Sequence, residues 1–142
     1  MVAPGAGEHR RTLPVITPAN QPYWTALRAH ELRLQRCTDC DTLRHPIAPS
    51  CPTCLSTATS WERMSGSGTL RSWIVVESSA GNPSREADVP YVIGVVELRE
   101  GLRLTAEIVR IDPHGLTNGQ AVEIGFDDVT SAITLPTFRP AS

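Results

Sequence analysis

All the cysteines of this 142-residue chain lie close together, at positions 37, 40, 51 and 54. They form two Cys-x-x-Cys pairs, Cys37 with Cys40 and Cys51 with Cys54, separated by residues 41–50. Each pair can form a turn that directs both sulfurs at one ion, and four thiolates around a tetrahedral ion are typical of a zinc ribbon. The spacing therefore predicts that these four cysteines are zinc ligands.

A cage of four thiolates leaves no open coordination position, whereas catalytic zinc keeps one for water or substrate. We therefore expect a structural ion that stabilises the fold. The spacing alone leaves two alternatives open, namely iron in the same cage and a redox dithiol pair. His45 lies between the two pairs. Because four thiols are available, we interpret it as a loop residue and not as a ligand.

Composition limits the classes of partner. The chain has 13 basic residues, all of them arginine, against 15 acidic residues, and its formal net charge is −2 at pH 7. Proteins that bind nucleic acid usually carry a positive surplus, so we expect no nucleic-acid partner. The sequence has no apolar run long enough to span a membrane, and its first residues have no signal-peptide core. We therefore expect a cytoplasmic protein without membrane contact, in which the cysteines are not oxidised to disulfides.

The chain divides into three predicted regions. Residues 1–16 have no hydrophobic periodicity, which predicts a flexible arm. Residues 17–60 hold a short helix, which Thr17 or Asn20 can cap, followed by the zinc ribbon. Residues 61–142 hold the remaining strands and a C-terminal tail.

Five segments after the cysteines have the composition and the alternation of β-strands. They are residues 67–77, 90–100, 101–111, 120–129 and 133–140. No long helix separates them, so parallel βαβ architecture is excluded. The sequence predicts a mostly β protein with an N-terminal helix, a rubredoxin-like zinc ribbon and a five-stranded OB-fold barrel. Residues 78–88 have the composition of an exposed, mobile loop.

Alternation also predicts which side chains of the first barrel strand face inward. The predicted inward set is Leu70, Ser72, Ile74 and Val76. The opposite face then carries Arg71 and Trp73, and the corresponding face of the third barrel strand carries Arg103. An indole beside arginines predicts a contact surface. The alternative, that Trp73 packs inside, stays open because tryptophan is usually largely buried.

The order of these features resembles a known family. The features are a short helix with Tyr23 and Trp24, then LRLQRCTDC, a His45-Pro46 loop, CPTC, SGSGTL, PYVIGVVEL and LPTFRP. This order resembles the zinc-ribbon plus OB-fold accessory family found beside thiolase-like enzymes, long catalogued only as a domain of unknown function. The resemblance covers about residues 17–140. The chain departs from the pattern at His45, where the family often has proline or an aromatic residue. It departs again at Asp41 and Leu55, where zinc ribbons often have glycine.

The resemblance implies a non-catalytic subunit that forms a hetero-oligomer with a thiolase-like enzyme, such as a sterol-carrier-type thiolase, an aldolase or an acyltransferase. Such complexes act on acyl-CoA thioesters, and steroid side-chain degradation is one setting in which relatives occur. The sequence is consistent with a non-catalytic subunit, because it has no Gly-x-Ser-x-Gly elbow, no phosphate-binding Gly-x-x-x-x-Gly-Lys loop and no cysteine beyond the four. The alternatives are a stand-alone OB-fold and zinc-ribbon protein that binds nucleic acid or acyl-CoA, and an electron-transfer protein.

Coenzyme A carries phosphates and an adenine, which suit arginine and aromatic side chains. The predicted contacts with the partner or with acyl-CoA are Arg71, Trp73, Arg103, Phe138 and Arg139. We expect Trp73 and Phe138 to be apolar anchors at the partner interface. The alternative is that both aromatic side chains pack inside the protein.

Overall fold

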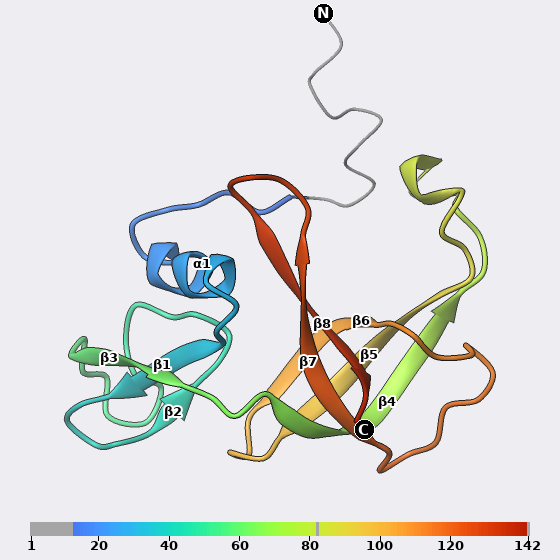
Figure 1. Cartoon of the computed structure of the whole chain (residues 1–142). Helices are drawn as coiled ribbons and strands as arrows, with labels where there is room; N and C mark the ends of the chain where they lie inside the picture. Colours follow the sequence, from blue (N-terminus) through green and yellow to red (C-terminus); the bar gives the residue numbers. More distant parts are fainter. Residues whose placement is uncertain (1–12, 82, 142) are drawn as a thin grey trace, which may run out of the picture.

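The structure is a computed structural model that describes residues 13–81 and 83–141. The described residues form one α-helix, a small sheet and a barrel (Figure 1). The small sheet has the strand order β2-β1-β3, is antiparallel, and contains β1 (Arg33–Cys37), β2 (Leu43–Arg44) and β3 (Thr59–Arg63). Of the predicted flexible arm, residues 1–12 lie outside the described residues.

Helix α1 (Gln21–Arg28) precedes the small sheet and packs against β1 and against the last strand, β8 (Thr134–Pro140). Pro22 stands in its first turn, where the missing N–H costs nothing. The predicted cap takes a different form, because Asn20 Oδ1 accepts the backbone N–H of Thr17 at 2.7 Å and shapes the turn before the helix. In the described part of the chain, no helix has the length and apolar character needed to cross a membrane.

The barrel confirms the predicted fold, because all five expected strands form. They are β4 (Ser67–Val76), β5 (Tyr91–Leu98), β6 (Arg103–Ile108), β7 (Ala121–Asp128) and β8 (Thr134–Pro140). The closed order is β4-β5-β6-β8-β7, in which only β6 and β8 run parallel. This is the connectivity of a five-stranded Greek-key barrel of the OB type. Between β4 and β5 the chain makes a long excursion that contains the short 3-10 helix η1 (Pro83–Arg85).

One hydrophobic core runs through the helix, the small sheet and the barrel. On the helix and ribbon side it includes Tyr23, Leu27 and Leu34, and on the barrel side it includes Leu70 and Phe138. Each of these side chains is at most 7% exposed. The ribbon therefore packs on the barrel through a shared apolar interior and is not tethered to it by a free linker.

A β-bulge in β4 overturns part of the predicted pattern. Leu70 pairs with Val96, whereas Ser72 pairs with Val95, so Arg71 is the extra residue. An extra residue reverses the alternation of side chains beyond it. Leu70 is fully buried as expected, but Ile74 is 63% exposed. The prediction that Ser72, Ile74 and Val76 face inward with Leu70 is therefore wrong.

A polar contact joins the end of α1 to the β7–β8 hairpin. His30 Nε2 lies 3.0 Å from Asp128 Oδ1, and the His30 ring stacks on the Phe126 ring at 4.9 Å between centroids. Asp128 also accepts the hydroxyl of Thr134 at 2.6 Å. The hydrogen bonds from Thr134 and His30 lower the pKa of Asp128. The contact therefore favours the ionised carboxylate in the folded state.

We predict that Asp128→Asn lowers the melting temperature at neutral pH by a few degrees. The pKa of Asp128 in the folded state is below the ordinary aspartate value of about 3.9. The stabilisation from the ionised Asp128 carboxylate is therefore fully present at pH values above about 3.9, and it is lost as the pH falls through the folded-state pKa of Asp128. Thermal melts test the first point, and NMR titration of the Asp128 carboxyl carbon tests the second. The exposed change Glu86→Gln is the control, and a normal titration of Asp128 would contradict the prediction.

Candidate metal centre and partner surface

The two cysteine pairs form matching turns at one end of the small sheet. In the first, Cys37 N–H donates to Thr42 O at 2.9 Å and Asp41 N–H donates to Cys37 O at 2.9 Å. In the second, Cys51 N–H donates to Ser56 O and Leu55 N–H donates to Cys51 O, both at 2.8 Å. The chain therefore folds the same way at both pairs. These are the knuckles of a zinc ribbon.

Each knuckle needs one residue in the left-handed region. Asp41 has φ 67° and Leu55 has φ 64°. These are the two positions where zinc ribbons often have glycine, the residue that adopts positive φ at least cost. Aspartate tolerates this region better than leucine does. The departure from glycine therefore leaves the knuckle geometry intact, at a conformational cost that falls mainly on Leu55.

The four thiols converge on one point. Cys37 Sγ lies 3.5 Å from Cys54 Sγ, and Cys40 Sγ lies 3.5 Å from Cys51 Sγ. All four sulfurs lie within 4.8 Å of one another. A tetrahedral ion with sulfur at about 2.3 Å requires sulfur–sulfur distances of about 3.8 Å. The donor set and its geometry therefore fit a tetrahedral metal ion coordinated by four thiolates.

Backbone amides around the sulfurs favour thiolates, which are the form that binds metal. The N–H groups of Cys54 and Thr53 lower the pKa of Cys51 to about 6. The N–H groups of Cys40 and Asp39 lower the pKa of Cys37. Cys37 and Cys51 are both fully buried. Each knuckle therefore holds one buried sulfur in an environment that stabilises negative charge.

His45 lies outside this group, in agreement with its interpretation as a loop residue. Among the residues that the structure describes, the group that can hold a metal ion consists of the four cysteines. The His45 ring lies 5.9 Å from the Tyr23 ring, and burial lowers the pKa of His45. The fold therefore places this side chain against α1.

Two buried polar side chains hold the loop between the knuckles. Gln35 forms a pair of hydrogen bonds with Ala48, accepting its N–H at 2.9 Å and donating to its carbonyl at 3.1 Å. Arg44 donates to the same carbonyl and to Thr59 Oγ1 at 2.6 Å. Sequence reasoning missed both. Gln35 occupies a strand position that alternation assigns to solvent, and Arg44 lies in a strand of only two residues, too short to show an alternating pattern.

The structure brings together only some of the predicted contact residues. Arg71 and Arg103 converge on Glu97, at 3.4 Å and 3.3 Å. Trp73 is half-buried and packs against the core. Arg139 lies on another strand pair, where it bonds Glu123 at 3.2 Å. Arg71 and Arg103 are therefore the members that lie near one another, whereas Trp73, which pairs with the buried Gly94, faces the barrel interior beyond the bulge.

Phe138 requires a correction. It was expected at a partner interface, but its side chain is completely buried. It lies in β8, where it is in register with Ile124 of β7 and with Ile108 of β6. An aromatic side chain enclosed by neighbouring strands cannot anchor a partner on this surface. The alternative of internal packing is therefore correct for Phe138.

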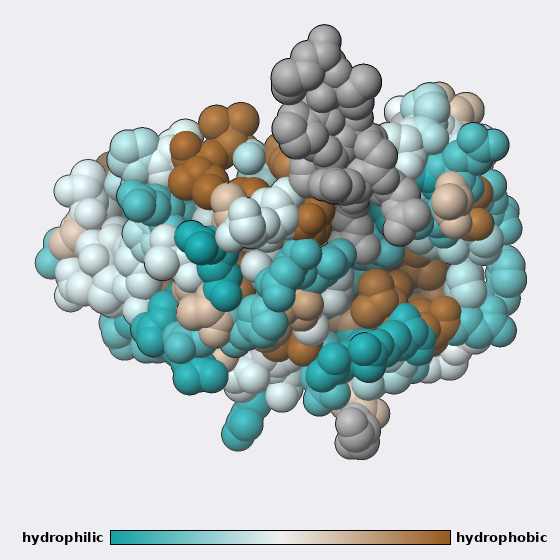
Figure 2. All heavy atoms as spheres, turned by 45° about the horizontal axis from the view of Figure 1, so that its top comes forward, coloured by the Kyte–Doolittle hydropathy of each residue, from teal (hydrophilic) through white to brown (hydrophobic). Residues whose placement is uncertain are grey.

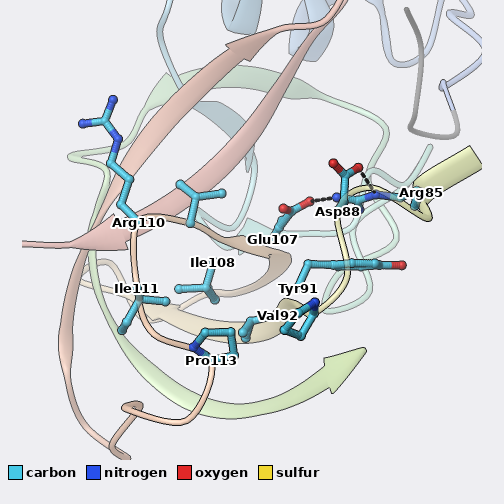
Figure 3. Close-up of a pocket in the computed structure, with 11 residues that line it drawn as sticks. Arg85, Asp88, Tyr91, Val92, Glu107, Ile108, Arg110, Ile111 and Pro113 are labelled. Atoms are coloured by element: carbon cyan, nitrogen blue, oxygen red, sulfur yellow. Dashed lines mark hydrogen bonds and ion pairs between the residues drawn. The ribbon is translucent and has the colours of Figure 1, made fainter. Parts of the chain in front are cut away.

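Sequence reasoning also missed a cluster around Arg85 in the segment expected to be an exposed, mobile loop. Arg85 is only 6% exposed. Its guanidinium lies 3.0 Å from Asp88 and 3.0 Å from Glu107, and 3.7 Å from the centre of the Tyr91 ring (Figure 3). These groups border a hollow of about 240 Å³. The only signal in the sequence was an arginine followed by two acidic residues, Glu86 and Asp88, which is also typical of a solvated loop.

Family models match most of the chain. The model described as the rubredoxin-like zinc ribbon domain of ChsH2 matches residues 24–60, and the model described as the C-terminal OB-fold domain of ChsH2 matches residues 61–127. A solved structure titled "Ltp2-ChsH2(DUF35) aldolase" has a TM-score of 0.83 and 36% identity. That likeness covers 92% of this chain and 100% of the solved chain.

Some curated relatives are named as hydratase alpha subunits, and others are named as DUF35 domain-containing scaffold proteins. The 3-oxo-4,17-pregnadiene-20-carboxyl-CoA hydratase alpha subunit of Mycobacterium tuberculosis is 38% identical over 75% of this chain. This chain spans only 33% of that subunit, and 40% of a second hydratase alpha subunit. A DUF35 domain-containing scaffold protein of Methanothermobacter thermautotrophicus is 33% identical, with 70% of this chain and 74% of the relative covered. The matched region is thus part of a larger subunit in some relatives and most of the protein in others.

Proposed function

This chain belongs to the ChsH2 (DUF35) family of zinc-ribbon and OB-fold proteins, and on that premise we propose that it is a non-catalytic subunit of a thiolase-like enzyme that acts on acyl-CoA thioesters. The observation that carries the proposal is the likeness, over the whole of the solved chain, to a structure whose title pairs ChsH2(DUF35) with Ltp2 in an aldolase. The name of the archaeal relative, a scaffold protein, supports the same role.

In this proposal the metal ion is structural zinc. The fit of four converging sulfurs to tetrahedral geometry supports zinc in this family of ribbons. Four protein ligands fill the coordination shell, so the ion stabilises the knuckles and offers no position for substrate. A thiolate cage requires reduced cysteines, which fits a cytoplasmic location.

The proposed substrate class is a coenzyme A thioester, in the setting of steroid side-chain degradation. The name of the mycobacterial relative, which specifies a pregnadiene carboxyl-CoA, supports this class. That relative is a hydratase subunit about three times as long as the matched region, so its reaction need not be performed by that region. We assign to this chain the supporting role and assign the bond-breaking chemistry to the partner.

The proposed contacts with the partner or with acyl-CoA are Arg71, Arg103 and Arg139, whereas the packing of Trp73 against the core supports the alternative that its side chain lies inside. The exposed arginines support this proposal, because each offers donors that suit a carboxylate or a phosphate. We also propose that residues 17–60 and 61–142 are the two functional regions of the chain, the first holding the metal and the second meeting the partner.

Co-expression with the thiolase-like subunit encoded in the same genome tests the proposal. We expect the two chains to co-purify, and we expect the partner to gain solubility or activity with acyl-CoA substrates. The chain alone should show no turnover. The control is the partner expressed with a ribbon-disrupted Cys37→Ser chain. Turnover by the isolated chain, or failure of the two chains to associate, would contradict the proposed function.

A further inference from the structure

The bulge in β4 turns a row of apolar side chains to the outside of the barrel. Four large hydrophobic residues are exposed in the described part of the chain, and Ile74 is the one that lies in a strand. Beyond the bulge the cross-strand pairs are Ser72 with Val95, Ile74 with Ile93 and Val76 with Tyr91. Paired residues project from the same face of a sheet. We name the resulting surface the outer patch: Ile74, Val76, Tyr91, Ile93 and Val95.

One end of the outer patch is covered by the chain itself. Arg85, from the excursion between β4 and β5, lies over the Tyr91 ring and pairs with Glu107 and Asp88 (Figure 3). A buried arginine with two carboxylates holds this segment firmly, because breaking such a cluster leaves an unpaired buried charge. Ile74, in contrast, is left open. The uncovered part of the patch thus lies beside a rigid border.

The other end of the outer patch carries excess positive charge. Arg71 and Arg103 share one carboxylate, that of Glu97, and their side chains are 40% and 63% exposed. An apolar centre with a polar, charged rim is the usual anatomy of a protein interface. In Figure 2 apolar surface gathers in separate areas, one toward the ribbon half of the view and one over the barrel half, each bordered by hydrophilic residues.

We propose that the outer patch is the surface on which the thiolase-like subunit docks, with an apolar side chain of the partner against Ile74 and a partner carboxylate facing Arg71 and Arg103. This inference rests on the proposed function and deepens it. The proposed docking surface does not include Phe138, which is buried.

The charges on this face favour a different chain over a second copy. Glu97 already pairs with two arginines, and both Asp88 and Glu107 pair with Arg85. A second copy would therefore present carboxylates that are already neutralised. The unmatched positive charge of Arg71 and Arg103 calls for a carboxylate from a partner of different sequence.

Calorimetric titration of the thiolase-like subunit with variants of the full chain tests the docking surface. We expect Ile74→Asp to weaken binding about tenfold or more, since a charge would replace a central apolar contact. Arg103→Glu should weaken binding and reverse its dependence on salt concentration. Both positions are exposed, so the melting temperature should stay within a few degrees of wild type. Aspartate at position 74 could weaken binding by disturbing strand β4. Ile74→Ala removes the apolar contact without adding a charge, and we expect it to weaken binding by a smaller factor.

The matched control is Val15→Asp. Val15 is an apolar residue that is 80% exposed and lies before α1, outside the outer patch and the knuckles. Its affinity for the partner should equal that of wild type. If the wild-type chain binds the partner and Ile74→Asp and Ile74→Ala bind equally well, the docking inference is wrong while the proposed function stands. If the wild-type chain does not bind the partner, both are wrong.

Two further measurements identify other occupants of the patch. Sedimentation of the chain alone reports self-association, and titration with free coenzyme A reports phosphate binding. We expect neither to change in Ile74→Asp or Arg103→Glu. If Ile74→Asp abolishes self-association without affecting the partner, the patch joins two copies. If Arg103→Glu reduces coenzyme A affinity without affecting the partner, the arginines serve a ligand. Either result overturns the docking inference.

Discussion

Replacing Cys51 with serine is expected to unfold the ribbon and to leave the protein insoluble or largely destabilised. Cys51 is fully buried, and its sulfur is one of the four that converge on one point. Apparent zinc-binding free energies in finger peptides are about 10–16 kcal/mol, whereas whole domains are stable by about 5–15 kcal/mol. Loss of one ligand therefore removes an amount comparable with the stability of the whole chain. Circular dichroism and thermal melts measure the effect.

Metal analysis and chelation complete this test. We expect one zinc per chain in the wild type and the same loss of structure when a strong chelator removes it. Thr53→Ser is the control, because it lies in the same knuckle, is exposed, and keeps the backbone N–H that donates to Cys51 Sγ. A coloured iron centre, a pair of disulfides, or a Cys51→Ser chain with full thermal stability would each contradict the zinc assignment.

The second large effect is expected at Phe138. Phe138→Ala should lower the free energy of unfolding by about 3–5 kcal/mol, because it leaves a cavity in the barrel interior. For a chain of this length that corresponds to a fall in melting temperature of about 10 °C or more. Denaturant unfolding and thermal melts measure both quantities.

Two controls separate packing from partner binding. Phe138→Leu should retain more stability, because it fills more of the space, and the exposed change Ile74→Ala should cost less than about 1 kcal/mol. The affinity of any folded Phe138→Ala chain for the partner should match that of wild type. Full stability combined with lost affinity would show that Phe138 meets the partner after all.

The zinc ribbon and the barrel strands were predictable because their signals are local. Two matched cysteine pairs specify a closed donor set, and period-two alternation specifies strands. The long segments from β5 to β8 therefore formed as expected, with Leu104, Ala106 and Ile108 facing inward. The resemblance to a family added the order in which these parts follow one another.

What the sequence could not show depends on contacts between distant residues. The bulge at Arg71 has no signature of its own in an alternating strand, yet it exchanges the inner and outer faces for the rest of β4. From the sequence alone, Arg85 is predicted to be a loop residue. It is buried only because strands β5 and β6 place Tyr91 and Glu107 beside it. Burial of Phe138 likewise follows from the parallel pairing of β8 with β6, which joins strands far apart in sequence.

The single interior shared by the helix, the ribbon and the barrel also bears on the cost of assembly. Two modules joined by a pliant connector lose rotational freedom when a partner fixes both of them, and that loss subtracts from affinity. Here Leu27 and Leu34 lie in the same apolar cluster as Leu70, so the relative orientation of the metal site and the outer patch is set during folding. A partner that contacts both the ribbon and the outer patch therefore binds one rigid body, and binding does not have to fix the orientation of one module relative to the other.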